Sequence, residues 1–199
     1  MTPTTASWLH EAPPEQIHAD GLALRRPLIE DGAALVAAVN ESLESLRPWM
    51  PWAQAPATLA TIGEFLRTAS DGWATGSQFQ YLVRDPEGDG VIGACGLNSR
   101  RGAGVLEIGY WVHSGHQRRG LASCAARVLT TIALELRGVR SVEIHHDKAN
   151  EISRRIPRRL GYRFVGEVAD HVSAPGEIGI DCTWRAGKEA WLATAAPGR

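Results

Sequence analysis

Residues 105–129, VLEIGYWV-HSGHQRRGLA-SCAARVL, decide the fold because they are typical of a strand, a basic turn and a helix in succession. The segment before the turn is apolar over the length of a strand, and the apolar residues after it repeat at helical spacing. A helix N-terminus exposes backbone N–H groups and the positive end of the helix dipole, both of which attract phosphate. Gly120 permits close approach of the backbone to an oxyanion, and two arginines add positive charge. The stretch therefore predicts a ligand that carries a pyrophosphate.

The residues of this predicted phosphate site are consecutive in the chain. They are Gln117, Arg118, Arg119, Gly120, Leu121, Ala122 and Ser123. An ordinary basic helix cap is the alternative, although arginine at a helix N-terminus opposes the dipole unless an anion compensates it.

The composition bounds the organisation of the chain. Its 199 residues, 44% hydrophobic and 22% charged, suit one domain with a substantial core. Residues 1–20 are rich in Pro, Thr and Ala, so we expect an N-terminal tail or extension there. We expect the folded domain over residues 21–186 and a C-terminal tail over residues 187–199.

Charge and cysteine usage exclude several classes of protein. The formal net charge of −1 provides no global attraction to nucleic acid. The three cysteines are odd in number and far apart, which argues against a disulfide framework and against a thiolate zinc site. The N-terminus lacks a signal-peptide pattern, and no apolar stretch has the length of a membrane span. We therefore expect a cytoplasmic protein without a membrane partner.

Other segments alternate between strand-like and helix-like patterns. The predicted strands are LALRRP, FQYLVRD, VIGACGLNS, SVEIHH, YRFVGEV and EIGIDCTWR. The predicted helices lie at residues 31–47, 58–70, 118–137 and 150–162. The three strands before the basic turn follow one another through glycine-rich turns and predict an antiparallel meander. This order of elements places the chain in the mixed α and β class.

A second glycine motif, Gly88-x-Gly90-x-x-Gly93, matches the letters of a dinucleotide fingerprint. It precedes a strand, whereas the fingerprint follows a strand and opens a helix, so we interpret it as a hairpin turn. The chain also lacks Gly-Lys-Ser/Thr after a glycine loop, Gly-x-Ser-x-Gly and His-Glu-x-x-His. These absences exclude Walker-type NTPases, hydrolases with a nucleophile elbow and zinc metalloproteases of that motif.

Gln117-x-x-Gly120-x-Ala122 resembles the acyl-CoA loop of the GNAT N-acetyltransferases, Gln/Arg-x-x-Gly-x-Gly/Ala. The segments LRPWMPWA, EIGYWV, NEISRR and RRLGYRFVGEV are similar to the RimJ/RimL-type branch, the ribosomal-protein-alanine acetyltransferases, over about Leu22 to Trp184. The resemblance implies an α+β fold with a splayed, mixed central sheet of about seven strands, flanked by about four helices.

The resemblance also implies acetyl-CoA as the cosubstrate and no metal. The pantetheine arm of acetyl-CoA would lie between the strand that ends at Val112 and the strand that ends at His146. Trp111 and Val112 would contact the arm through their backbone, and an N–H near Val112 would hold the thioester carbonyl. Asn150 matches an asparagine that bonds the pantetheine, and the same side chain could cap its helix.

Transfer to an amine needs a neutral nucleophile, and an α-amino group, with a pKa near ~8, loses its proton more readily than lysine, near ~10.4. Glu107 occupies a position that resembles the family's glutamate acting through water, with a solvent-facing or paired glutamate as the alternative. Glu143 is a second candidate carboxylate, and it shares a strand face with His145, so the two could form a hydrogen-bonded pair. His145 and His146 point to opposite faces, which disfavours a shared metal ion.

The leaving thiolate needs a proton donor. Much of the superfamily has a tyrosine seven residues after the asparagine, where this chain has Pro157. Ser153 matches the serine of the RimJ/RimL-type Asn-x-x-Ser and could bond the sulfur, with a surface serine as the alternative. An interior proline costs a helix about 3 kcal/mol, so we expect the helix that begins at Asn150 to kink or restart at Pro157.

Two further features concern the surface. Trp49 and Trp52 lie between two helices in a proline-broken segment and suggest a substrate-facing lid, with a place in the core as the alternative. Four arginines of the helix after Asn150 form a basic face that could contact the adenosine phosphate, an acidic protein or RNA, or simply be solvated. They are Arg154, Arg155, Arg158 and Arg159.

The sequence thus predicts an acetyl-CoA-dependent N-acetyltransferase with Glu107, Ser153 and Glu143 as candidate catalytic residues. The acceptor would be a primary amine, either a protein N-terminus or a small molecule, that attacks directly in a ternary complex. One alternative is a non-catalytic acyl-CoA-binding or sensing module, suggested by Pro157. The other is an RNA- or ribosome-binding protein that acts through the arginine face. The sequence leaves a homodimer open.

Overall fold

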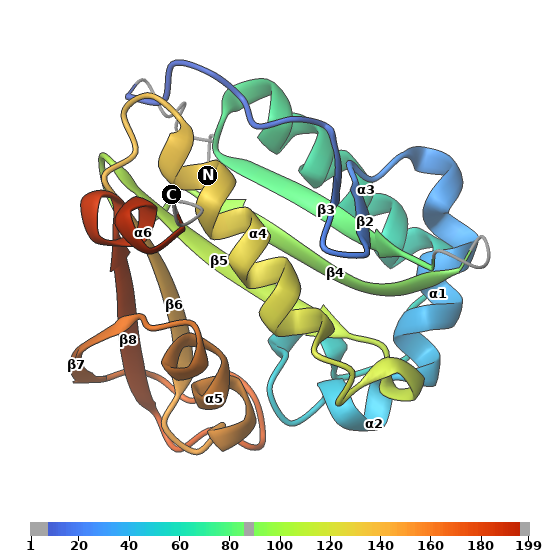
Figure 1. The fold of residues 1–199 in the computed structure, drawn as a ribbon. Coiled ribbons are helices and arrows are strands. Elements are labelled where there is room, and N and C mark those ends of the chain that lie inside the picture. Colours follow the sequence, from blue (N-terminus) through green and yellow to red (C-terminus); the bar gives the residue numbers. More distant parts are fainter. Residues whose placement is uncertain (1–7, 86–89, 196–199) are drawn as a thin grey trace.

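One eight-stranded sheet organises residues 8–85 and 90–195, the parts of the chain that the computed structural model describes (Figure 1). Its strands are β1 (Gln16–Ala19), β2 (Leu22–Arg25), β3 (Gln78–Arg84), β4 (Val91–Asn98), β5 (Val105–Val112), β6 (Ser141–Asp147), β7 (Arg163–Ala169) and β8 (Ile180–Gly187). They are arranged in the order β1-β2-β3-β4-β5-β6-β8-β7. The helices are α1 (Gly32–Glu41), α2 (Leu43–Leu46), α3 (Leu59–Thr75), α4 (Leu121–Glu135), α5 (Glu151–Arg159) and α6 (Lys188–Ala195). Short 3-10 turns occur at η1 (Ile29–Asp31), η2 (Pro51–Ala53) and η3 (Ser114–His116).

The sheet splays apart between β5 and β6. These two strands are parallel, and their register runs only from Val105 opposite Ser141 to Ile108 opposite Ile144. Beyond this point β5 continues along β4, and β6 continues along β8, so the two strands diverge (Figure 1). The remaining strand pairs are antiparallel. The splayed, mixed sheet of the predicted α+β fold is confirmed, with eight strands and six α-helices in place of about seven and about four.

Apolar residues form a core on each face of the sheet. On one face the apolar side of α4 packs against the strands, where Ala126, Leu129 and Leu134 are fully buried. On the other face α1 and α3 pack against Leu82 and Ala94. Alternation along β3 and β4 sends neighbouring side chains to opposite cores, which explains why these strands are apolar almost throughout.

The helix predicted over residues 31–47 is divided into α1 and α2 at Ser42, which is buried. The Ser42 hydroxyl accepts a hydrogen bond from the backbone N–H of Ser114 at 3.0 Å, in the connection between β5 and α4. The break therefore ties the end of α1 to the predicted phosphate loop.

We expected the helix that begins at Asn150 to kink or restart at Pro157, but α5 does not restart there. It is continuous from Glu151 to Arg159. Pro157 is buried in the last turn, close to the helix end, so its ring removes one N–H donor without interrupting the first two turns.

Two elements lie in segments that we expected to be tails. Strand β1 pairs with β2, and Trp8 packs against the larger core. At the other end, α6 contacts α4 through a hydrogen bond from the Trp191 indole to Thr131 at 3.0 Å. The domain limits at residues 20 and 187 stay predictions.

Of the second glycine motif, Gly90 directly precedes β4 and Gly93 lies within it, and β3 and β4 are antiparallel neighbours, as a hairpin requires. Gly88 itself lies outside the described residues. Among the described helices, none is both long and apolar enough to cross a membrane.

Candidate active site

The connection from β5 to α4 has an unusual backbone conformation. Arg118 and Gly120 both have left-handed φ angles, of 60° and 81°. Gly120 is the N-cap of α4 and, lacking a Cβ, adopts this conformation without strain. The same conformation at Arg118, a residue with a Cβ, is energetically unfavourable for the isolated loop. Backbone strain of this kind is typical of ligand-binding sites.

This loop presents a row of unused backbone donors. None of the N–H groups of residues 117–123 donates a hydrogen bond to any described part of the chain, and the helical series begins with Cys124 to the Gly120 carbonyl at 2.9 Å. An ordinary helix start leaves about four such groups unpaired. The row extends upstream of α4, so it offers more donors than a helix start alone, and such a series suits an anion. The individual contacts of residues 117–123 stay predictions.

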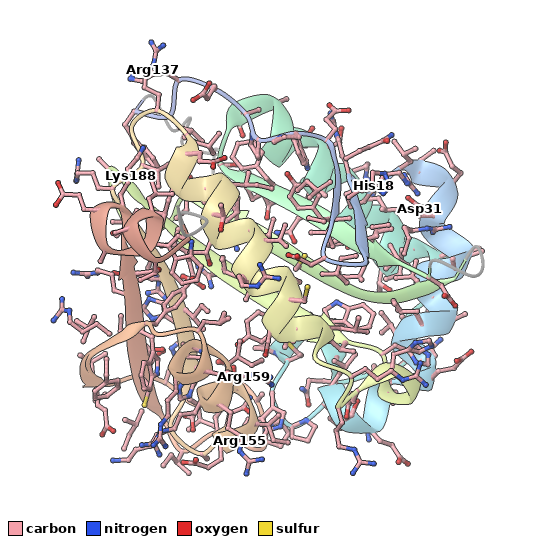
Figure 2. The ribbon with its side chains drawn as sticks, in the orientation of Figure 1. His18, Asp31, Arg137, Arg155, Arg159 and Lys188 are labelled. Carbon is pink, nitrogen blue, oxygen red and sulfur yellow. The ribbon has the colours of Figure 1, made fainter. Side chains whose placement is uncertain are left out.

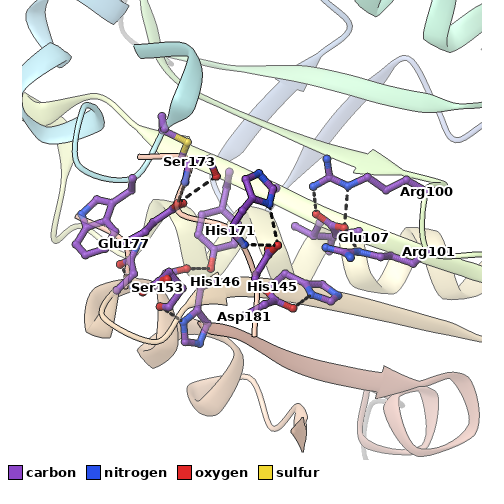
Figure 3. A pocket seen from close by; sticks show the side chains of 18 residues that line it. Arg100, Arg101, Glu107, His145, His146, Ser153, His171, Ser173, Glu177 and Asp181 are labelled. Carbon is purple, nitrogen blue, oxygen red and sulfur yellow. Dashed lines mark hydrogen bonds and ion pairs between the residues drawn. The ribbon is translucent and has the colours of Figure 1, made fainter. Parts of the chain in front are cut away.

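The divergence of β5 and β6 opens a cavity of about 290 Å³ (Figure 3). Its walls come from the ends of both strands, the start of α5 and the turn between β4 and β5. Trp49 and Met50 complete it from one side, and the loop over residues 170–179 from the other. These two sides meet where the Gly176 N–H donates to the Pro48 carbonyl at 2.8 Å.

Glu107 lies at the base of the cavity and is almost fully buried. Arg100 and Arg101, from the turn between β4 and β5, form ion pairs with its two carboxylate oxygens (Figure 3). Burial raises the pKa of Glu107, but the hydrogen bonds and charges of the two arginines outweigh burial, and the net pKa lies below its usual value. Glu107 is therefore an ionised, firmly held carboxylate.

Glu143 and His145 form the hydrogen-bonded pair that the sequence predicted. The Glu143 carboxylate contacts His145 Nε2 at 2.9 Å. On the other side of the ring, Asp181 of β8 contacts His145 Nδ1 at 2.7 Å, as Figure 3 shows. Arg185 donates from Nε to the other oxygen of Glu143 at 2.7 Å. Burial lowers the pKa of His145, but its bonds to Asp181 and Glu143 outweigh burial and raise it.

On the opposite face of β5, the hydroxyls of Tyr110 and Ser153 lie 3.1 Å apart. Asn150 caps α5 through a hydrogen bond from the Ser153 N–H to its side-chain oxygen at 3.0 Å. This confirms the capping role, and its contact with pantetheine stays a prediction. Burial raises the pKa of Tyr110 to about 12, so this hydroxyl keeps its proton at neutral pH and can donate a hydrogen bond.

His146 faces the core side of β6 and is engaged at both nitrogens. Its Nε2 accepts a hydrogen bond from the Trp184 indole at 3.0 Å, and its Nδ1 lies 2.8 Å from the Asp147 carbonyl oxygen. The geometry fits a neutral ring that donates from Nδ1. Within residues 8–85 and 90–195, no group of three or more His, Cys, Asp or Glu side chains is arranged to hold a metal ion.

The two tryptophans of the proposed lid occupy different places. Trp49 lines the cavity, whereas Trp52 is 53% exposed and lies against Trp111, with ring centroids 6.3 Å apart. Trp111 and Val112 belong to the part of β5 that has separated from β6. On this part of β5 the Val112 carbonyl accepts a hydrogen bond from the Gln117 side-chain amide at 3.5 Å, and the backbone contacts of Trp111 and Val112 with pantetheine stay predictions.

The arginines of α5 form a surface, as predicted. Arg154 pairs with Glu151 at 2.9 Å, and Arg155 and Arg159 are exposed along the helix (Figure 2). None of these three lines the cavity in the part of the chain that the structure describes.

Sequence reasoning missed several residues of the cavity, and four of them matter most for its charges and hydrogen bonds. They are Arg100, Arg101, Tyr110 and Asp181. The position of Tyr110 could have been predicted, because the strict alternation of side chains along EIGYWV places it on the strand face opposite Glu107. Nothing in the spacing of the other three indicates the carboxylate or the imidazole that each contacts.

Comparison with known proteins gives a consistent result. The family model "Acetyltransferase (GNAT) domain" matches residues 22–163. A Bacillus subtilis (strain 168) protein, named "Putative ribosomal N-acetyltransferase YdaF", is 27% identical over 154 residues, covering 74% of this chain and 80% of that protein. Two solved structures share the fold at lower identity. The Microcin C7 self immunity acetyltransferase MccE, in complex with acetyl-CoA and AMP, has a TM-score of 0.79 at 15% identity, covering 87% of this chain and 97% of that chain. RimL, the ribosomal L7/L12 alpha-N-protein acetyltransferase in complex with coenzyme A, has a TM-score of 0.77 at 20% identity, covering 87% and 98%.

Proposed function

The chain belongs to the GNAT acetyltransferase family and is an N-acetyltransferase, and on that premise we propose that it moves the acetyl group of acetyl-CoA to a primary amine by direct attack in a ternary complex. The observation that carries this proposal is the row of unused N–H groups over residues 117–123, at the mouth of a splayed sheet. The presence of CoA in RimL and of acetyl-CoA in MccE, which share the fold, supports the same ligand here.

The loop over residues 117–123 would bind the pyrophosphate of CoA through its backbone, because successive N–H donors and the positive end of α4 suit an anion. The pantetheine would extend along the separated edge of β5, beside Trp111 and Val112, and reach Asn150 at the start of α5. CoA supplies the acetyl group as a thioester with a good leaving group. The chain supplies position and hydrogen bonds.

Three groups would act at the reacting atoms. The backbone N–H near Val112 would donate to the thioester carbonyl, where negative charge develops during attack. Ser153, held by Tyr110, would donate a hydrogen bond to the sulfur as it leaves. Glu107 and Glu143 stand on the acceptor face, where Glu107 would receive the amine's proton through water. Because the pKa of Glu107 is lowered, we assign most of the rate to positioning rather than to proton abstraction.

The acceptor would be a protein N-terminus or a small-molecule amine. An α-amino group is the better match, because a large fraction of it is neutral near pH ~8 without help from a strong base. RimL acts on the N-terminus of a ribosomal protein, as its name states, and this supports a protein N-terminus as one class of acceptor to test.

The experiment measures thiol release from acetyl-CoA with peptides that have free N-termini, with polyamines and with aminoglycosides as acceptors. Turnover with at least one amine is expected, together with saturable CoA binding. Tight CoA binding without turnover on any amine would instead select the non-catalytic binding module. Absence of both would overturn the proposal.

A further inference from the structure

A chain of alternating charges reaches the cavity at His145 and Asp181 and ends in a carboxylate oxygen that has no partner among the described residues. Arg185 is paired with Glu143, Glu143 with His145, and His145 with Asp181. Asp181 uses Oδ2 for both of its contacts, with His145 at 2.7 Å and with Thr183 at 3.3 Å. Its Oδ1 makes no hydrogen bond or ion pair to the described residues. The series positive, negative, positive, negative therefore ends at Asp181, which lines the cavity beside His145 (Figure 3) and is also within the electrostatic influence of Arg101.

His145 is the fixed cation within this chain. Both ring nitrogens lie within hydrogen-bond distance of carboxylates, which only accept, so a doubly protonated ring satisfies both contacts and a neutral ring satisfies one. The side chain is only 10% exposed. His145 thus fixes the orientation of the Asp181 carboxylate, whose side chain is 15% exposed.

The buried carboxylates nearest to this chain have no comparable oxygen. Glu107 is occupied by two arginines, and Glu143 by Arg185 and His145. The carboxylate of Asp147 is used by backbone N–H groups, one at Oδ1 and three at Oδ2.

The two remaining carboxylates of the cavity lie on the loop over residues 170–179 or at its start. Asp170 is more than half exposed and pairs with His171. Glu177 binds the N–H groups of Ser173 and Ala174 and so holds the loop itself. Asp181 differs from both because it lies on a strand and is oriented by a buried partner.

The cavity that Asp181 lines has open space at Gly109, another of its lining residues. Gly109 of β5 faces the same side of the sheet as Glu107, two residues on, and a Cβ added there would meet nothing within 4 Å. Gly109 directly follows Ile108, the last β5 residue paired with β6. The space in front of Gly109 is therefore open on the sheet face that carries Glu107.

We propose that the free carboxylate oxygen of Asp181 binds the amino group of the acceptor, with His145 as the residue that positions it. This inference rests on the proposed function and specifies where the acceptor's amine is held. A cation continues the alternating series, and the same oxygen accepts a hydrogen bond from the N–H of the neutral amine that attacks. The site accordingly favours acceptors whose amino group carries a positive charge, and it binds the acetylated products more weakly, because an amide N–H donates a hydrogen bond but carries no charge.

The first experiment measures amine binding alone, without turnover. L-alaninamide is titrated into the protein saturated with CoA and followed by calorimetry, with N-acetyl-L-alaninamide as the uncharged comparison and spermidine as a second amine. Asp181→Asn keeps the shape of the side chain and removes its charge, so we expect amine affinity to fall by at least about tenfold. Asp170→Asn makes the same chemical change at the exposed carboxylate, and affinity should stay within about twofold.

Three outcomes would overturn the proposal. One is equal amine affinity in the wild type and Asp181→Asn. Another is an equal loss in Asp170→Asn, which would indicate a general effect of cavity charge. The third is absence of binding of both amines to the wild type. CoA affinity is measured in the same samples, so loss of CoA binding, which would contradict the proposed function, is distinguished from loss of the amine site.

The second experiment tests the positioning role of His145. His145→Gln should weaken amine binding less than Asp181→Asn does, with CoA affinity unchanged. If His145 acts through Asp181, the double variant should bind amine no more weakly than Asp181→Asn alone. Additive losses would show that His145 acts independently and would contradict this part of the proposal. For an acceptor that is turned over, both variants should raise KM more than they lower kcat.

Discussion

Glu107 and Glu143 are register partners on the two parallel strands β5 and β6, and each buried carboxylate is held by arginine from a different segment. Two like charges at adjacent strand positions repel each other. Arg100 and Arg101 offset this repulsion at Glu107, and Arg185 does so at Glu143. The strand register joins β5 to β6 at these positions, and the ion pairs reduce the repulsion between the two carboxylates.

Replacing Glu107 by Gln should lower the free energy of unfolding by about 1–2 kcal/mol, since the amide keeps hydrogen bonds but loses the charge that the arginines pair with. Because the folded-state pKa of Glu107 is lowered, this contribution is present above the unfolded value, near ~4.3, and is lost as the pH falls through the folded value. Urea unfolding between pH 7 and pH 3 measures it. Glu64→Gln, at an exposed position on α3, is the control. A difference from wild type that grows toward low pH would contradict the prediction.

Gly120→Ala should weaken CoA binding at least about tenfold, because the left-handed backbone that orients the loop amides costs a residue with a Cβ about 1–2 kcal/mol. A Cβ at Gly120 meets nothing within 4 Å, so the effect comes from conformation and not from a clash. Gly76, at the end of α3, has a φ of 69° and the same open space. Gly76→Ala should lose similar stability and keep its CoA affinity. Calorimetric titration with CoA and urea unfolding of both variants separate the two effects, and equal CoA affinities would count against the loop assignment.

Tyr110→Phe and Ser153→Ala should each lower kcat by about tenfold or more, since each removes a hydroxyl that we expect to support the leaving sulfur. The two losses should not add, because the hydroxyls act as one hydrogen-bonded pair. Tyr162→Phe removes a buried tyrosine hydroxyl that bonds Thr130 away from the cavity and serves as the control. Single-turnover rates at saturating acetyl-CoA measure the effect. Rates equal to wild type in both variants would leave water as the proton donor to the sulfur.

His145→Gln should change how stability depends on pH. The pKa of His145 is raised, so its contribution is fully present below the ordinary value, near ~6.5, and is lost as the pH rises through the folded value. Glu143 and Asp181 favour the charged ring, while Arg101 opposes it. The stability advantage of the wild type over the variant should therefore shrink between pH 6 and pH 9 in urea unfolding. His18→Gln, at an exposed position of β1, should show no such trend, and an advantage that increases with pH would refute the assignment.

The strand, turn and helix around Gly120 could be predicted because their signals are local. The apolar run, the glycine and the helical repeat lie within 25 consecutive residues of the chain, 105–129. The capping role of Asn150 is local in the same way, since its partner is Ser153. By contrast, β1 has only four residues. Its apolar Ile17 indicates a strand only when the pairing with β2 is known.

The electrostatics of the cavity could not be predicted, because its pairs join distant segments. His145 and Asp181 are 36 residues apart, and Tyr110 and Ser153 are 43 apart. Alternation places Glu107 on a face of β5, but it does not show that the arginines of the preceding turn fold back onto that face. The sequence thus locates the loop for the cosubstrate more sharply than the groups that meet the acceptor.

The hydrogen bond between Gly176 and Pro48 joins two segments of the chain that carry walls of the cavity, the one at Trp49 and Met50 and the loop over residues 170–179. A Cβ at Gly176 would come within 2.7 Å of the Pro48 carbonyl oxygen, so only glycine allows this contact. One methyl group at residue 176 would therefore force the loop over residues 170–179 away from Pro48 and would change two walls of the cavity at once.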